Sequence, residues 1–396
     1  MSHGPGKVAV RCMSQEEQIL RSDGSPSNVG HSLVGMYANI AATYRHFAEA
    51  EARGISATYD QWARGVSQDP AVLALLSELP GLKIQPNLVF AAARLKGAPV
   101  GDYEQFRAWL LTHWGEVKPE VLQRATQTNE ANRCAVMLPI LSRLDRLGTA
   151  AAPTAADAGS ADASTAADAG GQSAGERAPL ALIEAGASAG LCLYPDRYSY
   201  AYTTTAGETV KLHPKEGPSE VILPAAIDAD WVPDHIPEVA YRTGADLNPL
   251  NLADADELAW LETLIWPEHQ ERRDRLHAAA RIALEEPARI VAGDLVEAVP
   301  DLIRQAPAEA RIVVFHTWVL YYLSPEHREA FRAALAEFPN ITWISSEPYG
   351  VLPWVDQRHK TPFDHRVTLA VNGKPAALVG THGQSFEALR RVDPFL

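Results

Sequence analysis

The sequence has few cysteines and no long apolar run. Its three cysteines, Cys12, Cys134 and Cys192, are widely separated and form no CxxC pair, which predicts a reducing compartment and no structural zinc or other metal site. No stretch approaches the roughly 18 consecutive apolar residues of a membrane-spanning helix. The only apolar patch near the N-terminus, residues 8–10, is too short for a signal-peptide core. We therefore expect a cytoplasmic protein.

Positive charge is also scarce. The chain has 35 Lys and Arg against 49 Asp and Glu, a formal net charge of −14, and no basic cluster. This charge repels phosphate backbones and anionic membrane surfaces. We expect neither nucleic acid nor a membrane as a partner, but a small-molecule or peptide-like substrate.

The composition divides the chain into segments. A chain of 396 residues exceeds the size at which one hydrophobic core stops growing, so two domains are expected. Residues 1–35 are polar and predict a disordered lead-in, whereas residues 36–148 have helically spaced apolar residues and predict an all-helical cap domain. Within it, Asp69-Pro70 is typical of a helix start. Residues 149–178 are mostly Ala, Asp, Ser, Thr and Gly and predict a flexible linker.

In residues 179–396, short apolar strands alternate with amphipathic helices. Strands are expected at 180–185, 238–246, 289–293, 311–316, 341–346, 366–371 and 376–381, and helices at 254–264, 268–286, 295–305 and 325–337. This alternation predicts a doubly wound, mostly parallel α/β sheet of seven strands. Asn372-Gly373 is a hairpin signal, so the sheet should end in an antiparallel pair. The aromatic, turn-rich insertion at about 194–235 is expected to form a β-hairpin over the mouth of the site.

A glycine-rich loop follows the first strand. Its residues Gly186-Ala-Ser188-Ala-Gly190 fit the GxSxG elbow of serine hydrolases and, with Glu184, an acid-plus-glycine loop for a nucleotide-type cofactor; a tight turn without a ligand is the third interpretation. In α/β-hydrolases the elbow follows a later strand, which disfavours a serine hydrolase. A dinucleotide fingerprint would need glycine at positions 188 and 191, which disfavours an NAD-dependent oxidoreductase.

The pattern acid-x-Gly-x-Ser-x-Gly resembles motif I of class I S-adenosylmethionine-dependent methyltransferases, (D/E)xGxGxG. Asp246 resembles the acid that ends their second strand and binds the ribose, and Gly293-Asp294 resembles the Gly-Asp near the adenine. Residues 311–331 look like the fourth strand and the following helix. The resemblance covers about 179–396 and implies a methyltransferase-like Rossmann fold that transfers a methyl group to a small or peptide-like acceptor. The implied cofactor is S-adenosylmethionine, held by Glu184, Gly186, Ser188, Gly190, Asp246 and Asp294.

The whole chain also resembles a bacterial family of conserved proteins of unknown function. The matching features are Gln127-Thr-Asn-Glu130 followed by Arg133-Cys134, the E-x-G-A-S-A-G-L loop and an F-H-T segment before a helix. This resemblance implies no particular activity. A non-catalytic binding or regulatory protein with a changed cofactor site is therefore an alternative, and Ser188 in place of the middle glycine and the long insertion favour it.

The candidate residues also have structural interpretations. Glu184 is an acid at the end of a buried strand, which is costly without a ligand or partner, although it could cap the following turn. The glycines could serve a tight turn alone. Asp246 could cap a turn and Asp294 a helix.

His316 ends the strand at 311–316 and is the candidate catalytic base, with Tyr321 close behind it in the sequence. A structural histidine and an aromatic helix face in the core are the alternatives. The polar run of QTNEANR lies in an otherwise apolar segment, either as a solvated helix face or as part of the pocket. The candidate substrate contacts are Gln127, Asn129, Glu130, Arg133, Glu347 and Tyr349.

Overall fold

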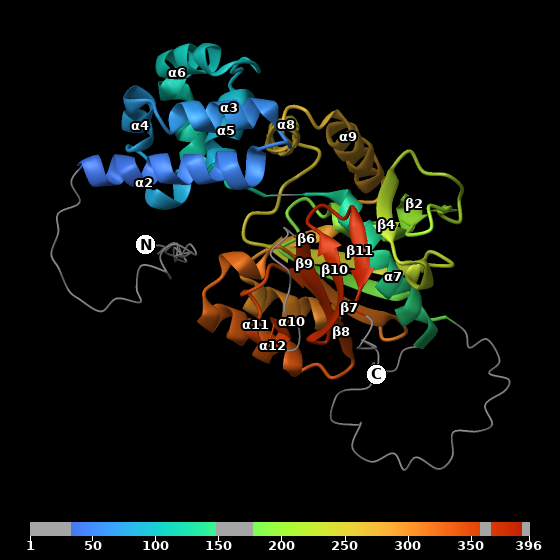
Figure 1. Ribbon diagram of the computed structural model, residues 1–396. Helices are drawn as coiled ribbons and strands as arrows, with labels where there is room; N and C mark the ends of the chain where they lie inside the picture. Colours follow the sequence, from blue (N-terminus) through green and yellow to red (C-terminus); the bar gives the residue numbers. More distant parts are fainter. Residues whose placement is uncertain (1–32, 128, 148–176, 357–365, 390–396) are drawn as a thin grey trace, which may run out of the picture. The chain divides into compact units, whose positions relative to one another are not determined.

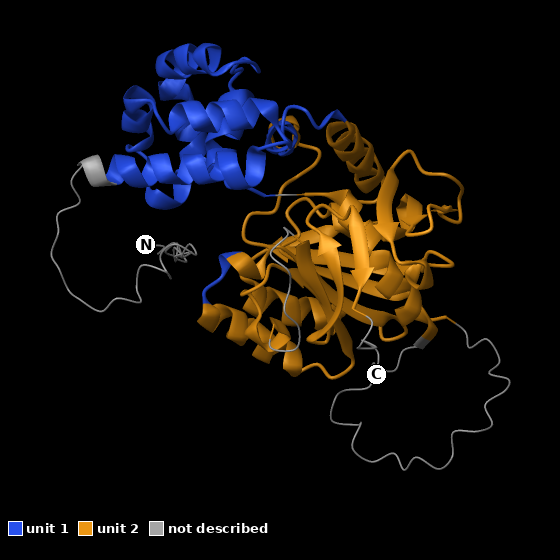
Figure 2. Cartoon of the chain, in the orientation of Figure 1, with its two compact units in different colours: residues 1–128, 259–270, 322–324 blue, residues 129–258, 271–321, 325–396 orange. Residues whose placement is uncertain are grey.

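The computed structural model describes residues 33–127, 129–147, 177–356 and 366–389. The chain divides into two compact units (Figure 2). The helical unit comprises residues 1–128, 259–270 and 322–324, and the sheet unit comprises residues 129–258, 271–321 and 325–396. The division falls at residue 128, ahead of the linker expected at 149–178. The expected lead-in and linker lie almost wholly outside the described residues.

The helical unit consists of short helices joined by tight turns. Asp69 accepts hydrogen bonds from the amides of Ala71 and Val72, and Pro70 occupies the first helical position, so the predicted helix start is confirmed. The elements from the N-terminal part of the chain are α2 (Leu33–His46), a π-helical turn (Phe47–Ala52), α3 (Ala57–Val66), α4 (Pro70–Leu76), α5 (Pro86–Leu95) and α6 (Tyr103–Gln123).

Aromatic side chains form the core of the helical unit. Trp62 and Phe106 stack with ring centroids 3.9 Å apart, and Phe90 meets both rings edge-on. The later segment 259–270 joins this unit through Trp266, whose Nε1 donates to Asn87 Oδ1 at 2.9 Å. Sequence-distant helices thus share one apolar core.

The sheet unit is built on one sheet of eleven strands (Figure 1). Their order is β3-β2-β4-β11-β10-β9-β8-β7-β1-β5-β6. The strands are β1 (Leu180–Ala185), β2 (Ser199–Thr204), β3 (Thr209–Leu212), β4 (Ile222–Ile227), β5 (Val239–Asp246), β6 (Arg289–Ala292), β7 (Arg311–Thr317), β8 (Ile341–Glu347), β9 (Arg366–Val371), β10 (Lys374–Gly380) and β11 (Ser385–Ala388).

Five of the predicted strands form a parallel block in the order β6-β5-β1-β7-β8. β9 then pairs antiparallel with β8, and β10 antiparallel with β9. Asn372 and Gly373 both have positive φ, 49° and 73°, as a two-residue hairpin turn requires. The mixed α/β architecture with a helical N-terminal region is therefore confirmed, and so is the antiparallel hairpin at Asn372-Gly373. The sheet does not end at this pair, because β11 adds to β10.

The prediction of seven strands is wrong, because four more strands extend the sheet. The insertion supplies β2, β3 and β4, and the chain after β10 supplies β11. β2 and β3 do form a hairpin, but it extends the edge of the sheet through parallel pairing of β2 with β4 and of β4 with β11. β3 has four residues and β4 contains Pro224, so neither resembles a buried strand in the sequence.

Helices of the sheet unit pack against the strands. α10 contacts β1, β5 and α11, and α7 contacts β4. The helices are α7 (Cys134–Leu144), most of α9 (Gln270–Glu285), α10 (Leu295–Gln305), α11 (Pro325–Ala336) and α12 (Pro353–Asp356), while α8 (Ala255–Leu264) begins in this unit. In the sheet, β5 and β6 lie on one side of β1, and β7 and β8 lie on the other. The strand order therefore reverses between β1 and β7, and their carboxyl ends flank a topological switch point.

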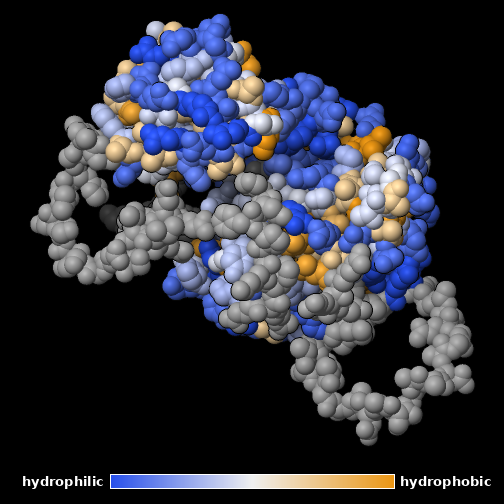
Figure 3. Space-filling view, viewed as in Figure 1, coloured by the Kyte–Doolittle hydropathy of each residue, from blue (hydrophilic) through white to orange (hydrophobic). Residues whose placement is uncertain are grey.

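Hydrophilic side chains predominate on the face shown in Figure 3, and hydrophobic ones form small patches there. No helix within the described ranges is long and apolar enough to cross a membrane.

Candidate functional site

Glu184 lies at the carboxyl end of the central strand β1. Its side chain is buried, with 5% of the residue exposed, and Oε2 has no hydrogen-bond partner among the described residues. Burial raises the pKa of Glu184 well above its ordinary value, with a further contribution from Cys192; Arg133 opposes this shift. The carboxyl group is therefore held in its neutral form next to a switch point, without the partner that buried acids usually have.

The loop after Glu184 is a tight turn whose amides face the protein. Gly186, Ser188 and Gly190 have φ of 73°, 52° and 75°. Five loop amides donate within the protein: Gly186 and Ala187 to Ala245 O, Ser188 to Asp246 Oδ2, Gly190 to Ala187 O, and Leu191 to Asn129 Oδ1. A phosphate cradle needs several free amides, which this loop does not present.

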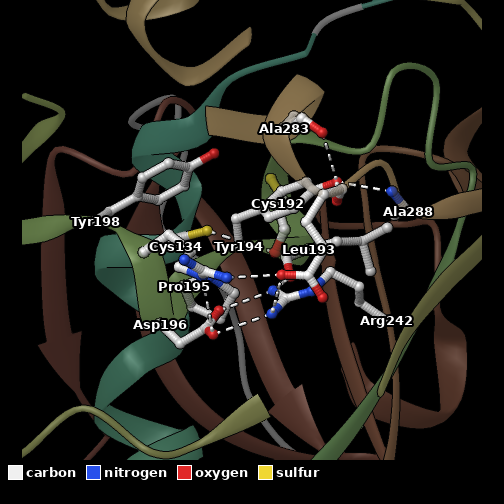
Figure 4. Close-up of polar contacts among 12 residues, drawn as sticks. Cys134, Cys192, Leu193, Tyr194, Pro195, Asp196, Tyr198, Arg242, Ala283 and Ala288 are labelled. Carbon is white, nitrogen blue, oxygen red and sulfur yellow. Dashed lines mark hydrogen bonds and ion pairs between the residues drawn. The ribbon is translucent and has the colours of Figure 1, made fainter. Parts of the chain in front are cut away.

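No α-helix follows the loop, whereas the cofactor loop of a doubly wound fold leads directly into a helix. The chain instead makes two 3₁₀ turns, Leu191–Leu193 and Pro195–Arg197, and enters β2. Arg242 fixes this segment by donating to Leu193 O and, in a bidentate pair, to Asp196 (Figure 4). The hydroxyl of Tyr194 donates to Glu286 O at 2.9 Å, with Ala283 O more distant at 3.4 Å, and accepts from the Ala288 amide. Side-chain contacts thus replace a helix here.

Protein side chains occupy the space next to the loop glycines. A Cβ added at Gly186 would lie 2.3 Å from Val319 Cγ2, and one at Gly190 would lie 2.8 Å from Ile290 Cδ1. Close packing together with positive φ explains both glycines. The interpretation as a tight turn accounts for them without a ligand.

Asn129 clamps the loop from outside the parallel block. Its Nδ2 donates to Ala187 O and its Oδ1 accepts from the Leu191 amide, both at 3.1 Å. The neighbouring Glu130 is buried and paired with Arg272 at 2.6 Å and Arg275 at 3.2 Å. Burial opposes ionisation of Glu130, but the two arginines hold its pKa below the ordinary value. Residues 129–133 of the polar run therefore belong to the interior of the sheet unit and do not form a solvated helix face.

Arg133 ends this run and is 7% exposed. Its Nε donates to Thr381 O at 3.2 Å, and its Nη1 donates to both the carbonyl and the hydroxyl of Thr317, at 3.4 and 3.0 Å. Burial lowers the pKa of the guanidinium. Arg133 thus ties the end of β7 to the turn after β10 through neutral acceptors.

The aspartates predicted to bind the cofactor have partners in the structure. Asp246 ends β5, and its two oxygens accept from the amides of Ser188 and Asn248, each at 2.8 Å. Asp294 caps α10 by accepting from the Val296 amide, which confirms the helix-cap interpretation. It also contacts His327 Nε2 at 2.8 Å.

His316 is completely buried on the other face of the sheet. Glu184 is in register with Phe315, so the next residue, His316, points to the opposite face. Its Nδ1 contacts Glu347 Oε1 at 2.7 Å, and its ring packs against Phe331 and Trp343. The structure therefore does not bring His316 together with Glu184.

Glu347 organises the turn after β7. Its Oε1 accepts from the amides of Val319 and Leu320, and its Oε2 from the amide of Tyr321. Tyr321 thus meets Glu347 through its backbone, whereas Tyr349, the next candidate, is 46% exposed. Gln127 falls in the helical unit.

Trp318 is a candidate that the sequence did not reveal. It follows β7 with φ of +58°, a strained value for a bulky residue, and its Nε1 is buried without a partner among the described residues. Asn132 Oδ1 and Ser188 Oγ are likewise buried and unpartnered. Glu184, Ser188 and Trp318 lie at or directly after the carboxyl ends of β1 and β7, whereas the Asn132 amide lies against Pro224 of β4 and His382 after β10. Buried polar atoms without a partner are typical of a ligand or water site. No sequence motif marks Trp318, since strain depends on the folded backbone.

Within the described ranges, no group of three or more His, Cys, Asp or Glu side chains is placed to hold a metal ion. Cys134 and Cys192 are buried free thiols; each sulfur donates to a backbone carbonyl, that of Cys192 and that of Glu130 respectively. Their burial makes them structural rather than reactive.

The fold and this edge define an α/β protein with a central parallel block and buried, unpartnered polar atoms at the carboxyl ends of its strands. A family model matches residues 41–153 and 165–387, and the chain belongs to that family, described as an uncharacterized protein conserved in bacteria (DUF2332). The prediction of a conserved bacterial family is thus confirmed. No curated protein and no solved structure matched the chain.

Proposed function

We propose that the sheet unit binds S-adenosylmethionine at the carboxyl ends of β1 and β5 and transfers its methyl group to a small or peptide-like acceptor. The observation that carries this proposal is the buried, unpartnered Oε2 of Glu184 next to the Gly186–Gly190 loop. A buried carboxyl group without a partner is costly, and a ligand with ammonium or hydroxyl donors would offset that cost.

The donor groups at this edge favour S-adenosylmethionine over a dinucleotide. Five of the six amides of residues 186–191 are bonded within the protein, so the loop lacks the set of free donors that a pyrophosphate needs. S-adenosylmethionine has no phosphate; its ammonium and ribose hydroxyls match the carboxyl groups of Glu184 and Asp246. Each carboxylate oxygen can accept more than one hydrogen bond, so Asp246 can bind a hydroxyl while it holds the Ser188 and Asn248 amides.

The protein's part in this chemistry is to bind, align and exclude water. S-adenosylmethionine supplies an activated methyl group when bound, so the protein needs no nucleophile of its own. A cation beside Glu184 stabilises the ionised form of its carboxyl group, so binding releases a proton from Glu184. Glu347 and His316 hold the turn that carries Trp318, and we assign them positioning roles.

A non-catalytic binding protein is the second candidate. The replacement of the expected helix by two 3₁₀ turns and the engagement of Asp294 with His327 favour it. In that case the same edge binds a ligand, but no methyl group is transferred.

Calorimetry with S-adenosylmethionine, S-adenosylhomocysteine and NADH tests the proposal. We expect the first two to bind and NADH not to bind. Glu184→Gln should weaken binding by about tenfold to a hundredfold, as expected for a lost hydrogen bond to a charged group, while the exposed control Glu216→Gln should not. Binding without turnover of a broad acceptor panel would favour the second candidate, and absence of binding would contradict the proposal that this edge binds S-adenosylmethionine.

A further inference from the structure

Arg133 is a buried cation that has no counter-charge in ion-pair contact among the described residues. Its bonded partners are the neutral acceptors Thr317 and Thr381. Of the two acids in its electrostatic surroundings, Glu130 is already paired with two other arginines and Glu184 is held neutral by burial. Burying a guanidinium group without a counter-charge destabilises the folded protein, so an anion bound beside Arg133 would stabilise it.

One nitrogen of Arg133 is available for that anion. Nε and Nη1 are engaged, whereas Nη2 donates to no atom of the described chain. Thr317 and Thr381 fix the plane of the guanidinium through the other two nitrogens. The group is thus oriented in advance, which lowers the entropic cost of binding a planar partner.

We propose that Arg133 is the recognition residue for a carboxylate group of a ligand bound at the carboxyl ends of β1 and β7. A monoanion fits better than a phosphate for two reasons. The five loop amides that could share a second negative charge are bonded elsewhere, and the carboxyl group of Asp246 at the same edge repels a dianion more strongly than a monoanion.

The carboxylate has two possible sources, namely the amino-acid part of S-adenosylmethionine or the acceptor. Only the first rests on the proposed function. We therefore measure them in separate arms with wild type, Arg133→Gln, Arg133→Lys and the surface control Arg281→Gln. Thermal unfolding identifies any variant that loses the fold, and Arg133→Lys keeps the charge if Arg133→Gln does not fold.

The first arm compares S-adenosylmethionine with its decarboxylated analogue. Wild type and Arg281→Gln should bind the carboxylate form about tenfold to a hundredfold more tightly, and Arg133→Gln should lose that preference. Arg133→Lys should keep a reduced preference because it lacks the planar fork. Such a result assigns the carboxylate to the cofactor.

The second arm measures thermal stabilisation by propionate and benzoate against propionamide and benzamide. Stabilisation of wild type by the acids but not the amides, lost in Arg133→Gln, supports the carboxylate site even if S-adenosylmethionine does not bind. If wild type discriminates in neither arm, or if Arg133→Gln discriminates as well as wild type in both, Arg133 is not a carboxylate site. The failure of this inference is thereby distinguishable from the failure of methyl-donor binding.

Discussion

The Nδ1 of His316 and the Oε1 of Glu347 lie 2.7 Å apart in a pair that solvent does not reach. The same carboxylate accepts from three successive amides of the turn that follows β7. One acid therefore fixes both the imidazole at the end of β7 and the turn that carries Trp318.

We predict that Glu347→Ala destabilises the protein by about 3–5 kcal/mol, because it leaves three backbone amides and a buried imidazole without their acceptor. Urea denaturation followed by circular dichroism measures the change. The exposed Glu337→Ala should alter stability by less than about 0.5 kcal/mol. Equal stabilities of the two variants would show that Glu347 is not the centre of the turn.

Glycine at position 188 should stabilise the protein. Ser188 has a left-handed backbone and a buried, unpartnered hydroxyl. Ser188→Ala removes the hydroxyl alone, whereas Ser188→Gly also relieves the backbone. We therefore expect Ser188→Gly to exceed Ser188→Ala by about 1 kcal/mol in thermal or chemical unfolding. The reverse order would mean that the turn is not strained at this residue.

Asn129→Asp should loosen the glycine-rich loop. The change replaces the amide that donates to Ala187 O by an oxygen that repels this carbonyl, while the bond from Leu191 can persist. We expect a loss of about 1–3 kcal/mol and faster hydrogen exchange of the amides of Gly190 and Leu191. Asn340→Asp, at an exposed position, is the matched control, and unchanged exchange in Asn129→Asp would contradict the clamp.

The raised pKa of Glu184 makes stability depend on pH. The folded protein keeps this proton to higher pH than the unfolded chain, whose value is near 4.5. The contribution of Glu184 is thus fully present below that pH and is lost as the pH rises toward the folded pKa. Glu184→Gln removes this loss, so its stability relative to wild type should grow by about 1.4 kcal/mol per pH unit between the two pKa values. Denaturation across this range measures it; a pH-independent difference would contradict a neutral Glu184.

Much of the sheet unit was predictable because its central strands are apolar on both faces. Short apolar runs such as LALIEA and RIVVFH predict buried strands, and the dipeptide Asn372-Gly373 predicts a hairpin turn. The strands β3 and β4 were not predicted, since both are half exposed, β3 is short and β4 contains a proline. Helix α7 lies within residues 36–148, which were expected to form the cap domain, but it belongs to the sheet unit and contacts β4. The spacing of apolar residues indicates a helix there but does not specify which unit the helix packs against.

The candidate site was predictable only in part. Glu184 was found because an acid inside an apolar run is conspicuous, and Arg133 and Asn129 because a polar run interrupts an apolar segment. The face on which His316 lies follows from the register between β1 and β7, which no local pattern specifies. The partners of Asp246 and the strain at Trp318 likewise exist only in the folded backbone.

The pairing of β4 with β11 has a consequence for synthesis on the ribosome. Ala226 and Ile227 of β4 pair with Ser385 and Phe386 of β11, which are synthesised much later. Until that last segment leaves the ribosome, β4 has an unpaired edge able to pair with another nascent chain. This part of the sheet is completed only after Phe386 has been made, so a chain truncated before β11 should expose an edge prone to aggregation.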